Sequence, residues 1–493
     1  MGKGARNREK YTEERVAKKE QAIVLEKKNK RNKLITKIVA TILAVVIAVS
    51  GTIYFTVFAN GSYLRNNIVA SSENFRINNA MMTYFVKSSY VSMQMQYGEY
   101  FTMFTGIDPA KSLKKQYIDE EKKTSWFQNI VDTTKTYVTE VLLLNEAAKL
   151  DGVTLTEAEI ANIDEDIKDI DPYFTQNGVS LQDIKDVRIL IDTAQKYESE
   201  VKAQIEISDN EINNYYDENE NTYRTVGYKT YSINYADGQA ETVVPYTQEV
   251  ANEKTEELKN ASSSEDFDTL VTTMVKEQNP EMSDEDVKSR VEGTLVANGA
   301  YNEDDEFLKW AFGDERVAGE SYVIKDEETK VNKIYYLLNP AERNEDETVD
   351  FRHILFASEE YNSSVVLKEK AQEILDMYNK DASVENFSSL ASENTDDVGS
   401  RTTGGLYTGV AQGQMVPEID EWIFDSERKV GDVELIETDY GTHIVYFDGE
   451  GKEVWQETVI IDMKNADFDE KMTKLAEDHP IISDSEKLND IPV

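Results

Sequence analysis

Two stretches in the second half of the chain alternate between hydrophobic and polar residues with a period of two. In residues 349–356 (VDFRHILF), the side chains of Phe351, His353 and Leu355 fall on one face of an extended chain. Residues 438–447 (TDYGTHIVYF) are rich in β-branched and aromatic residues and also contain a histidine. Both patterns predict β-strands.

The segment between these two runs has the periodicity of helices. Residues 366–379 form one candidate helix, and Ser383 can cap a second one. A turn at Gly404 and Gly405 precedes residues 413–425 (GQMVPEIDEWIFD), which have the pattern of a third helix. This order of strand, helices and strand predicts a small α+β domain with two adjacent central strands and one histidine on each.

The region from residue 60 to residue 207 repeats its apolar residues at helical spacing. The first such run contains Phe75, Ile77, Met81, Met82, Phe85 and Val86, and the second contains Trp126, Phe127, Ile130, Val131, Val138, Val141 and Leu142. Thr156 and Glu159 have the spacing of a capping box, as do Ser208 and Glu211. We therefore expect a helical domain over residues 60–207.

A stripe of methionine and aromatic side chains follows the first of these helical runs. It consists of Met81, Met82, Met93, Met95, Phe101, Met103 and Phe104. One interpretation is that these residues form part of the core. The other is that they form an adaptable surface for unfolded polypeptides, because flexible methionine side chains suit such binding.

Residues Ile38–Phe58 contain no charged residue over 21 positions. A helix of about 20 apolar residues crosses a bilayer, and the preceding lysines place the N-terminus in the cytoplasm by the positive-inside rule. A cleaved signal peptide is the alternative, because Val57-Phe58-Ala59 resembles a small-residue cleavage site. We expect an uncleaved single-pass anchor, with the bulk of the chain extracytoplasmic.

Charge is distributed unevenly along the 493 residues. Residues 1–37 contain 13 Lys and Arg against 5 Glu, a net charge of +8, so the formal charge of −42 leaves −50 for the remainder. This acidic balance argues against nucleic acid as a partner. The chain has no cysteine, which excludes disulfides and a lipid-modified N-terminal cysteine.

Two histidines on neighbouring strands admit several interpretations. They could form a purely structural hydrogen-bonded pair. A zinc site is not expected, because it needs further ligands, and the third histidine, His479, lies in a polar C-terminal tail. A serine hydrolase is not expected either, since no GxSxG motif occurs.

The motifs FRHILF, ENTDD, GGLY, GQMVPEIDEWIFD, RKVGD and TDYGTHIVYF occur in this order over about 100 residues, and together they resemble a parvulin-type peptidyl-prolyl cis/trans isomerase domain. The resemblance implies that His353 and His443 are the paired central histidines. It also implies that Asp397, or its neighbour Asp396, is the acidic residue and that Thr438 is the hydroxyl bonded to the pair.

The same resemblance implies a substrate site with an apolar pocket for the proline ring. Met415 and Ile419 match that pocket, and Ile419 replaces the more usual Phe. Leu355 and Tyr440 are further candidate substrate contacts. No metal and no cofactor are implied.

An internal repeat extends the resemblance upstream. Residues 310–319 align with residues 422–431 at a displacement of 112 positions, with identical residue types at five of them, beginning with Trp310 and Trp422. Aligning YKTYS with FRHIL puts Thr230 in the place of His353, and aligning NKIYYL with THIVYF puts Lys333 in the place of His443. We therefore expect a degenerate parvulin-like domain over residues 208–345, ahead of the isomerase domain over residues 346–450.

Residues 451–493 are expected to be a C-terminal extension, with a strand over 454–463 and a helix over 468–477. The predicted chain is thus an α+β multidomain protein. It has an N-terminal transmembrane helix, a helical domain resembling the chaperone region of SurA-like and PrsA-like foldases, and two tandem parvulin-like domains. The resemblance implies an extracytoplasmic foldase acting on unfolded or newly exported polypeptides. The alternative is a non-catalytic membrane-anchored holdase or assembly scaffold that only binds unfolded peptides.

Overall fold

The computed structural model describes residues 61–119, 121, 123–236, 246–358, 364–488 and 491. The predicted membrane anchor, Ile38–Phe58, lies outside these residues. Among the helices that the structure does describe, none is both long and apolar enough to cross a membrane. The chain divides into two compact units, one formed by the residues up to Tyr197 together with those from Met472 onward, and the other by Glu198–Lys471.

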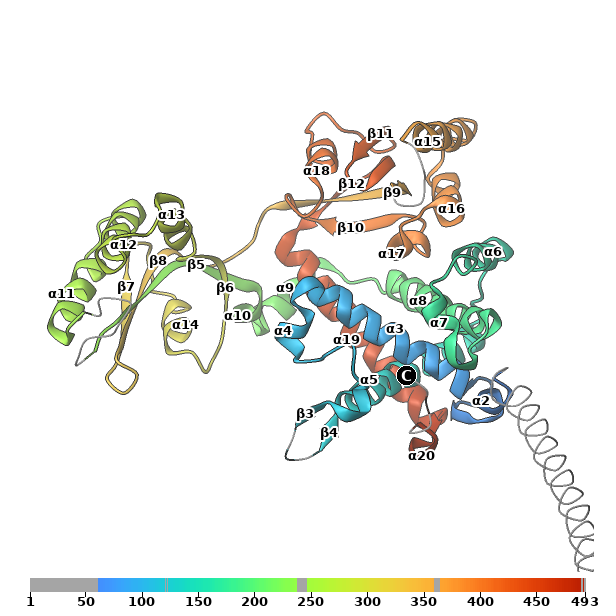
Figure 1. Cartoon of the computed structure of the whole chain (residues 1–493). Coiled ribbons are helices and arrows are strands. Elements are labelled where there is room, and N and C mark those ends of the chain that lie inside the picture. Colours follow the sequence, from blue (N-terminus) through green and yellow to red (C-terminus); the bar gives the residue numbers. More distant parts are fainter. Residues whose placement is uncertain are drawn as a thin grey trace, which may run out of the picture. The chain divides into compact units, whose positions relative to one another are not determined.

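The first unit is mainly helical (Figure 1). Its elements in chain order are α2 (Ser62–Asn66), β1 (Ile68–Ser71), β2 (Arg76–Asn78), α3 (Asn79–Tyr97), α4 (Phe101–Thr105), β3 (Tyr117–Asp119), β4 (Thr124–Ser125), α5 (Trp126–Asp151), α6 (Glu157–Asp166), α7 (Pro172–Thr175), most of α8 (Leu181–Gln204), β13 (Ile482–Ser483) and α20 (Ser485–Leu488). Strand β13 pairs with β1, which pairs with β2, and both pairings are antiparallel. The C-terminal segment therefore completes a sheet that begins near the start of the described chain.

Capping residues set the ends of these helices as their sequence predicts. The Thr156 side chain accepts the backbone N–H of Glu159, and the Glu159 side chain accepts the backbone N–H of Thr156, so the predicted capping box at α6 is confirmed. The box of Ser208 and Glu211 is also present, at α9 (Asp209–Glu218). Helix α5 ends at Gly152, whose φ of 78° suits glycine.

The methionine and aromatic stripe divides between core and surface. Met81, Met82 and Phe101 are buried, as expected of core residues. Met103 and Phe104, in α4, are 69% and 66% exposed. Part of the stripe therefore belongs to the core, and part of it forms an exposed surface.

The predicted strand over residues 454–463 is wrong, because α19 (Val454–Asp478) is one continuous helix. The β-branched run Thr458 to Ile461 favours a strand locally. In the structure, however, Trp455 and Val459 lie four residues apart and pack in the same buried cluster as Ile212 of α9. That helical spacing of the buried side chains overrides the local preference.

The second unit contains two four-stranded antiparallel sheets, each with helices packed against it. The first sheet region has α9, α10 (Glu220–Tyr223), β5 (Arg224–Asn234), α11 (Gln248–Lys259), α12 (Ser264–Gln278), α13 (Asp284–Glu292), β6 (Leu295–Ala300), α14 (Glu306–Ala311), β7 (Ser321–Asp326) and β8 (Val331–Arg343). The second has β9 (Glu347–Ala357), α15 (Ser364–Tyr378), α16 (Val384–Asn394), α17 (Val398–Arg401), β10 (Leu406–Val410), α18 (Pro417–Ile423), β11 (Val433–Thr438) and β12 (Gly441–Glu453).

The two sheets have the same strand order. It is β6-β5-β8-β7 in the first and β10-β9-β12-β11 in the second, and the two long strands are central in both. The register also agrees, because Thr230 lies opposite Tyr335 in the first sheet as His353 lies opposite Val445 in the second. The internal repeat in the sequence thus corresponds to a repeat in strand order and register.

The second sheet carries a hydrophobic cluster on each of its faces. One face places Ile354, Phe356 and Ile444 against α15 and α16. The other places Phe351, Val445 and Phe447 against α18. Since side chains alternate along a strand, His353 and His443 lie on the α18 face.

Candidate functional site

His353 and His443 form a buried pair on the two central strands β9 and β12. His353 lies opposite Val445, and His443 lies opposite Leu355, so the two histidines are diagonal neighbours on one face. Their Nδ1 atoms are 3.1 Å apart, and their rings are nearly parallel, with centroids 5.4 Å apart. The structure therefore brings together two residues that are 90 positions apart in the sequence.

Asp397 holds the outer end of this pair. Its Oδ2 lies 2.8 Å from His353 Nε2, and its Oδ1 accepts the backbone N–H of Gly399 at the start of α17. Neighbouring Asp396 instead accepts the backbone N–H of Ala357. Of the two aspartates that the sequence left open, Asp397 is the one beside the histidine.

Several donors keep the Asp397 carboxylate charged. Burial by itself would raise the pKa of Asp397, but hydrogen bonds from His353, Ser400 and Tyr407 together hold that pKa well below its usual range. The Tyr407 hydroxyl donates to Oδ2 at 3.0 Å, and the Ser400 hydroxyl donates to the same oxygen. A permanent carboxylate favours a proton on His353 Nε2.

Thr438 closes the other end of the network. Its Oγ1 lies 2.9 Å from His443 Nε2 and accepts the backbone N–H of Tyr440. If His353 donates from Nε2 to Asp397, the neutral pair requires His443 to donate from Nδ1 to His353, and the Thr438 hydroxyl then donates to His443. All donors in the network thus run in one direction, from Thr438 towards Asp397.

His443 is held neutral in this arrangement. Burial lowers the pKa of His443 to about 4, and a proton on His353 would act in the same direction. At neutral pH its Nε2 is therefore available as an acceptor for Thr438. The histidine pair is suited to fixing the electrostatics of the site, and it contains no activated nucleophile.

Gly405 sets the backbone position of His353. Its carbonyl oxygen accepts the backbone N–H of His353 at 3.0 Å, and its φ is +78°, in the left-handed region. A Cβ at Gly405 would lie 2.3 Å from the carbonyl oxygen of His353. Glycine at this position therefore permits the close approach of the turn to β9.

The four candidate substrate contacts differ in burial and in their position relative to the histidines. Ile419 is buried and Met415 is half-buried, and both belong to the cluster on the α18 face. Leu355 is half-buried and lies directly opposite His443. Tyr440 lies between β11 and β12 with its side chain 66% exposed, and its backbone N–H joins the network through Thr438.

Tyr407 and Ser400 are site residues that the sequence analysis did not single out. The Tyr407 ring stacks on Phe351, with centroids 5.3 Å apart and planes at 9°, and it is nearly perpendicular to the His353 ring, with planes at 78°. Burial and the Asp397 charge raise the pKa of Tyr407 to about 12, which keeps its hydroxyl protonated. The motif GGLY includes Tyr407, so its position two residues after Gly405 was the available signal.

The corresponding position in the first sheet has no histidine. Lys333 lies opposite Ser232 there, as His443 lies opposite Leu355. The rings of Phe307 and Tyr335 stack at 3.9 Å, and Lys333 Nζ lies 4.8 Å from the Tyr335 ring centre. Aromatic side chains thus occupy the region that the histidine network and its apolar neighbours occupy in the second sheet.

Metal ligands do not gather in the part of the chain that the structure describes. Within it, no group of three or more His, Cys, Asp or Glu side chains is arranged to hold a metal ion.

Comparison with known proteins agrees with the geometry of the second sheet. The model of the PPIC-type PPIase domain family matches residues 334–450. The foldase protein PrsA of Oceanobacillus iheyensis is 25% identical over 256 residues, which cover 48% of this chain and 81% of that protein.

Two solved structures have partial similarity to the chain. PrsA from Bacillus subtilis is 19% identical, with 59% of this chain and 82% of that chain covered and a TM-score of 0.19. A SurA-like chaperone of Campylobacter jejuni is 14% identical, with 82% of this chain and 94% of that chain covered and a TM-score of 0.17. These whole-chain scores are too low to establish a shared arrangement. The match over residues 334–450 identifies the second sheet domain as a PPIC-type peptidyl-prolyl isomerase domain, in a chain that is similar in sequence to a PrsA foldase.

Proposed function

We propose that the chain is an extracytoplasmic foldase whose second sheet domain catalyses cis/trans isomerisation of X-Pro peptide bonds in exported polypeptides. The observation that supports this most directly is the continuous network of Asp397, His353, His443 and Thr438 beside an apolar cluster. His353, His443, Asp397 and Thr438 are the proposed catalytic residues. Met415, Ile419, Leu355 and Tyr440 are the proposed substrate contacts.

The reaction requires little covalent chemistry. Rotation about a peptide C–N bond faces a barrier of about 18–20 kcal/mol, because resonance gives that bond partial double-bond character. A twisted amide loses this resonance and is less polar than the planar one. An apolar pocket that grips the proline ring and excludes water therefore favours the twisted form over the planar ground state.

The network contributes a fixed electrostatic environment to this pocket. Asp397 remains ionised, and His443 remains neutral. The direction of the hydrogen bonds is thereby fixed before substrate arrives, so that little reorganisation accompanies the rotation. We assign the histidines this role rather than that of a nucleophile.

The test is a proline-peptide isomerisation assay on the full chain. His443→Ala should lower kcat/KM by at least tenfold while the unfolding transition of the domain is retained. His479→Ala is the matched control, because this third histidine lies in the first unit beside Glu73 and should leave activity unchanged. A folded His443→Ala variant with wild-type activity would overturn the assigned site.

The helical unit supports a chaperone role alongside catalysis. An exposed apolar patch consists of Met95 and Tyr97 at the C-terminal end of α3, Tyr100 in the turn that follows, and Met103 and Phe104 in α4. The rings of Tyr97 and Tyr100 contact the ring of Phe104. Exposed patches of this kind are typical of interaction sites. If the wild-type chain suppresses aggregation of an unfolded protein but does not isomerise proline peptides, the non-catalytic holdase is the correct function.

We also propose that Ile38–Phe58 anchors the chain in the cell membrane, with the N-terminus in the cytoplasm. The uncharged run of 21 residues and the net charge of +8 before it support this topology. The acidic remainder would then act on polypeptides outside the membrane.

A further inference from the structure

The turn at Gly404 and Gly405 lies between two donors of Asp397. Before it, α17 provides the Ser400 hydroxyl, and after it, β10 provides the Tyr407 hydroxyl. Both hydroxyls donate to Asp397 Oδ2. The position of this turn therefore determines whether the carboxylate keeps two of its hydrogen bonds.

Arg352 holds this turn from the side of β9 opposite to the His353 side chain. Successive side chains of a strand alternate, so those of Arg352 and His353 point to opposite faces of the sheet. Arg352 Nη1 donates to the carbonyl oxygens of Thr403 and Gly404, at 3.3 and 3.5 Å. The backbone N–H of His353 donates to the carbonyl oxygen of Gly405 at 3.0 Å. Two adjacent residues of β9 thus hold three consecutive carbonyls of one turn.

Further partners fix the guanidinium group of Arg352. Its Nη1 also donates to Ser388 Oγ of α16 at 3.0 Å, and its Nε forms an ion pair of 2.5 Å with Asp448 of β12, without the geometry of a hydrogen bond. The side chains of Arg352 and Asp448 are only 15% and 22% exposed, so these contacts lie largely out of water, where charge interactions are stronger. Arginine suits this position because its planar group directs several N–H donors in a fixed fork, whereas the lysine ammonium is a point charge.

The first sheet offers a comparison at the same position. Lys229 lies opposite Tyr336 there, as Arg352 lies opposite Tyr446 in the second sheet. Lys229 is also buried, and its ammonium pairs with the carboxylate of Asp268 on α12. The position of the cation is therefore common to both copies, but the arginine is not.

The backbone bond between strand and turn is also common to both copies. In the first sheet the N–H of Thr230 donates to the carbonyl oxygen of Thr294 at 2.9 Å, as that of His353 donates to Gly405 in the second. The fold therefore forms with a lysine at this position. The arginine occurs in the copy that has the Gly-Gly turn and the Asp397 network.

We propose that Arg352 is a positioning residue for proline isomerisation, which holds the Gly-Gly turn so that Ser400 and Tyr407 stay directed at Asp397. This inference rests on the proposed function, since it adds Arg352 to the support of the same catalytic network. The guanidinium lies on the face of the sheet away from the histidine pair, so it acts through the turn rather than on the substrate.

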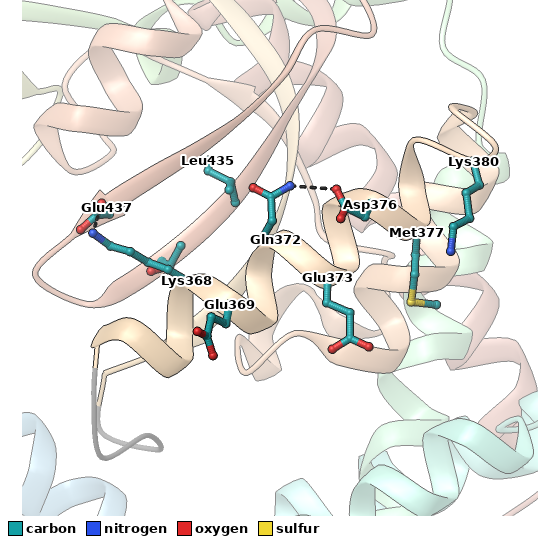
Figure 2. Close-up of a pocket in the computed structure, with 10 residues that line it drawn as sticks. Lys368, Glu369, Gln372, Glu373, Asp376, Met377, Lys380, Leu435 and Glu437 are labelled. Atoms are coloured by element: carbon teal, nitrogen blue, oxygen red, sulfur yellow. Dashed lines mark hydrogen bonds and ion pairs between the residues drawn. The ribbon is translucent and has the colours of Figure 1, made fainter.

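A second cation on this face provides a matched control. Helix α15 and the hairpin of β11 and β12 border a groove of about 830 Å³, where Lys368 pairs with Glu437 at 2.7 Å (Figure 2). Both side chains are more than half exposed, so this ion pair contributes little to stability. Lys368→Ala removes a cation from the same face and leaves the contacts of the turn in place.

The test is a double-mutant cycle, measured as isomerisation of a short, uncharged proline peptide by the full chain. Arg352→Lys should lower kcat about tenfold with little change in KM, because the apolar substrate contacts remain. Combined with Tyr407→Phe, it should lower kcat by less than the product of the two separate losses, since both changes act through Asp397. Lys368→Ala should have wild-type kinetics and should leave the loss caused by Tyr407→Phe unchanged.

Asp448→Asn is a second variant, which keeps the shape of the partner of Arg352 but weakens the ion pair. It should lower kcat about threefold, while urea unfolding shows that the domain is folded. If Arg352→Lys does not fold, the same cycle of Asp448→Asn with Tyr407→Phe decides the question. Amide hydrogen exchange gives a readout besides activity, because exchange of residues 403–407 should be faster in Arg352→Lys than in the wild type, with that of β12 unchanged.

The outcomes distinguish this inference from the proposed function. Wild-type kcat in a folded Arg352→Lys variant, beside a His443→Ala variant of low activity, would overturn the inference alone. So would losses that multiply in full with Tyr407→Phe, or unchanged exchange of residues 403–407. A wild-type chain that does not isomerise proline peptides would overturn the proposed function, and this inference with it.

Discussion

His353 and His443 approach each other through their Nδ1 atoms, which are 3.1 Å apart. Only one of these two nitrogens can carry the proton of that hydrogen bond. Protonating both rings would place two N–H groups and two positive charges against each other at a buried position. The pair is therefore sensitive to acid in a way that a surface histidine is not.

The stability of the second sheet domain should fall between about pH 6.5 and pH 4. Burial lowers the pKa of His443 from 6.5 to about 4. In this window the unfolded chain binds more protons than the folded one, so the free energy of unfolding decreases as the pH falls. The free energy of unfolding has its full value above pH 6.5, and its decrease approaches about 3 kcal/mol at pH 4.

Amide hydrogen exchange of β12 measures this effect within the full chain, because it reports the stability of one region. The comparison is His443→Gln, which removes the titrating group. Exchange protection of the wild type should decline through the window more steeply than that of the variant. Parallel profiles of the two proteins would rule out His443 as the cause.

Tyr407→Phe should lower isomerase activity by about tenfold or more while the domain stays folded. The change removes one hydrogen bond to Asp397, and a hydrogen bond to a charged group contributes about 1.5–3 kcal/mol. The ring would still stack on Phe351. Steady-state kinetics over pH 5–8 measure the effect, and Tyr137→Phe is the control, because this exposed tyrosine lies in α5 of the first unit. Unchanged kinetics in Tyr407→Phe would show that this hydroxyl does not support Asp397.

Gly405→Ala should reduce both stability and activity. A Cβ there would lie 2.3 Å from the His353 carbonyl oxygen, and the φ of +78° is strained for alanine. We expect a loss of at least about 1–3 kcal/mol from the backbone strain alone. Gly413→Ala is the matched control, since it also has a positive φ but its Cβ would meet nothing within 4 Å. Urea unfolding of both variants gives the comparison, and equal losses would show that the contact with His353 is not the cause.

The first sheet domain should not isomerise proline peptides. Thr230 and Lys333 occupy its histidine positions, and Phe307 and Tyr335 fill the adjacent space. The His353→Ala, His443→Ala double variant of the full chain should therefore have no activity above the uncatalysed rate, whereas Lys333→Ala should have wild-type activity. Residual activity in the double variant that disappears on adding Lys333→Ala would contradict this.

The proposed anchor predicts which part of the chain a protease can reach. Trypsin added to intact, wall-stripped cells should digest residues after Phe58 and leave a membrane-bound fragment that contains the N-terminus. Mass spectrometry of the membrane fraction identifies that fragment. Recovery of a released chain that begins at Asn60 would instead indicate a cleaved signal peptide.

Local patterns in the sequence were sufficient for the two central strands of the second sheet, the helix caps and the face that each histidine occupies. The alternation in VDFRHILF and TDYGTHIVYF determines which face each histidine occupies, because the period of a strand is two residues. The displacement of 112 residues between Trp310 and Trp422 likewise predicted a second copy, and the shared strand order and register agree with it. Strands and caps depend on neighbours within a few residues, and a repeat is the same local pattern occurring twice, so the sequence displays both directly.

Tertiary structure decided the features that depend on distant partners. Asp397 rather than Asp396 meets His353, because the start of α17 directs its side chain towards β9. Residues 454–463 form a helix despite a β-branched run, because Trp455 and Val459 pack with Ile212. Strand β13 pairs with β1 more than 400 residues earlier in the chain, and the groove beside α15 needs a hairpin that follows some 60 residues later. Local periodicity sets which face of an element is apolar, but the partner that covers this face is determined by the packing of the whole chain.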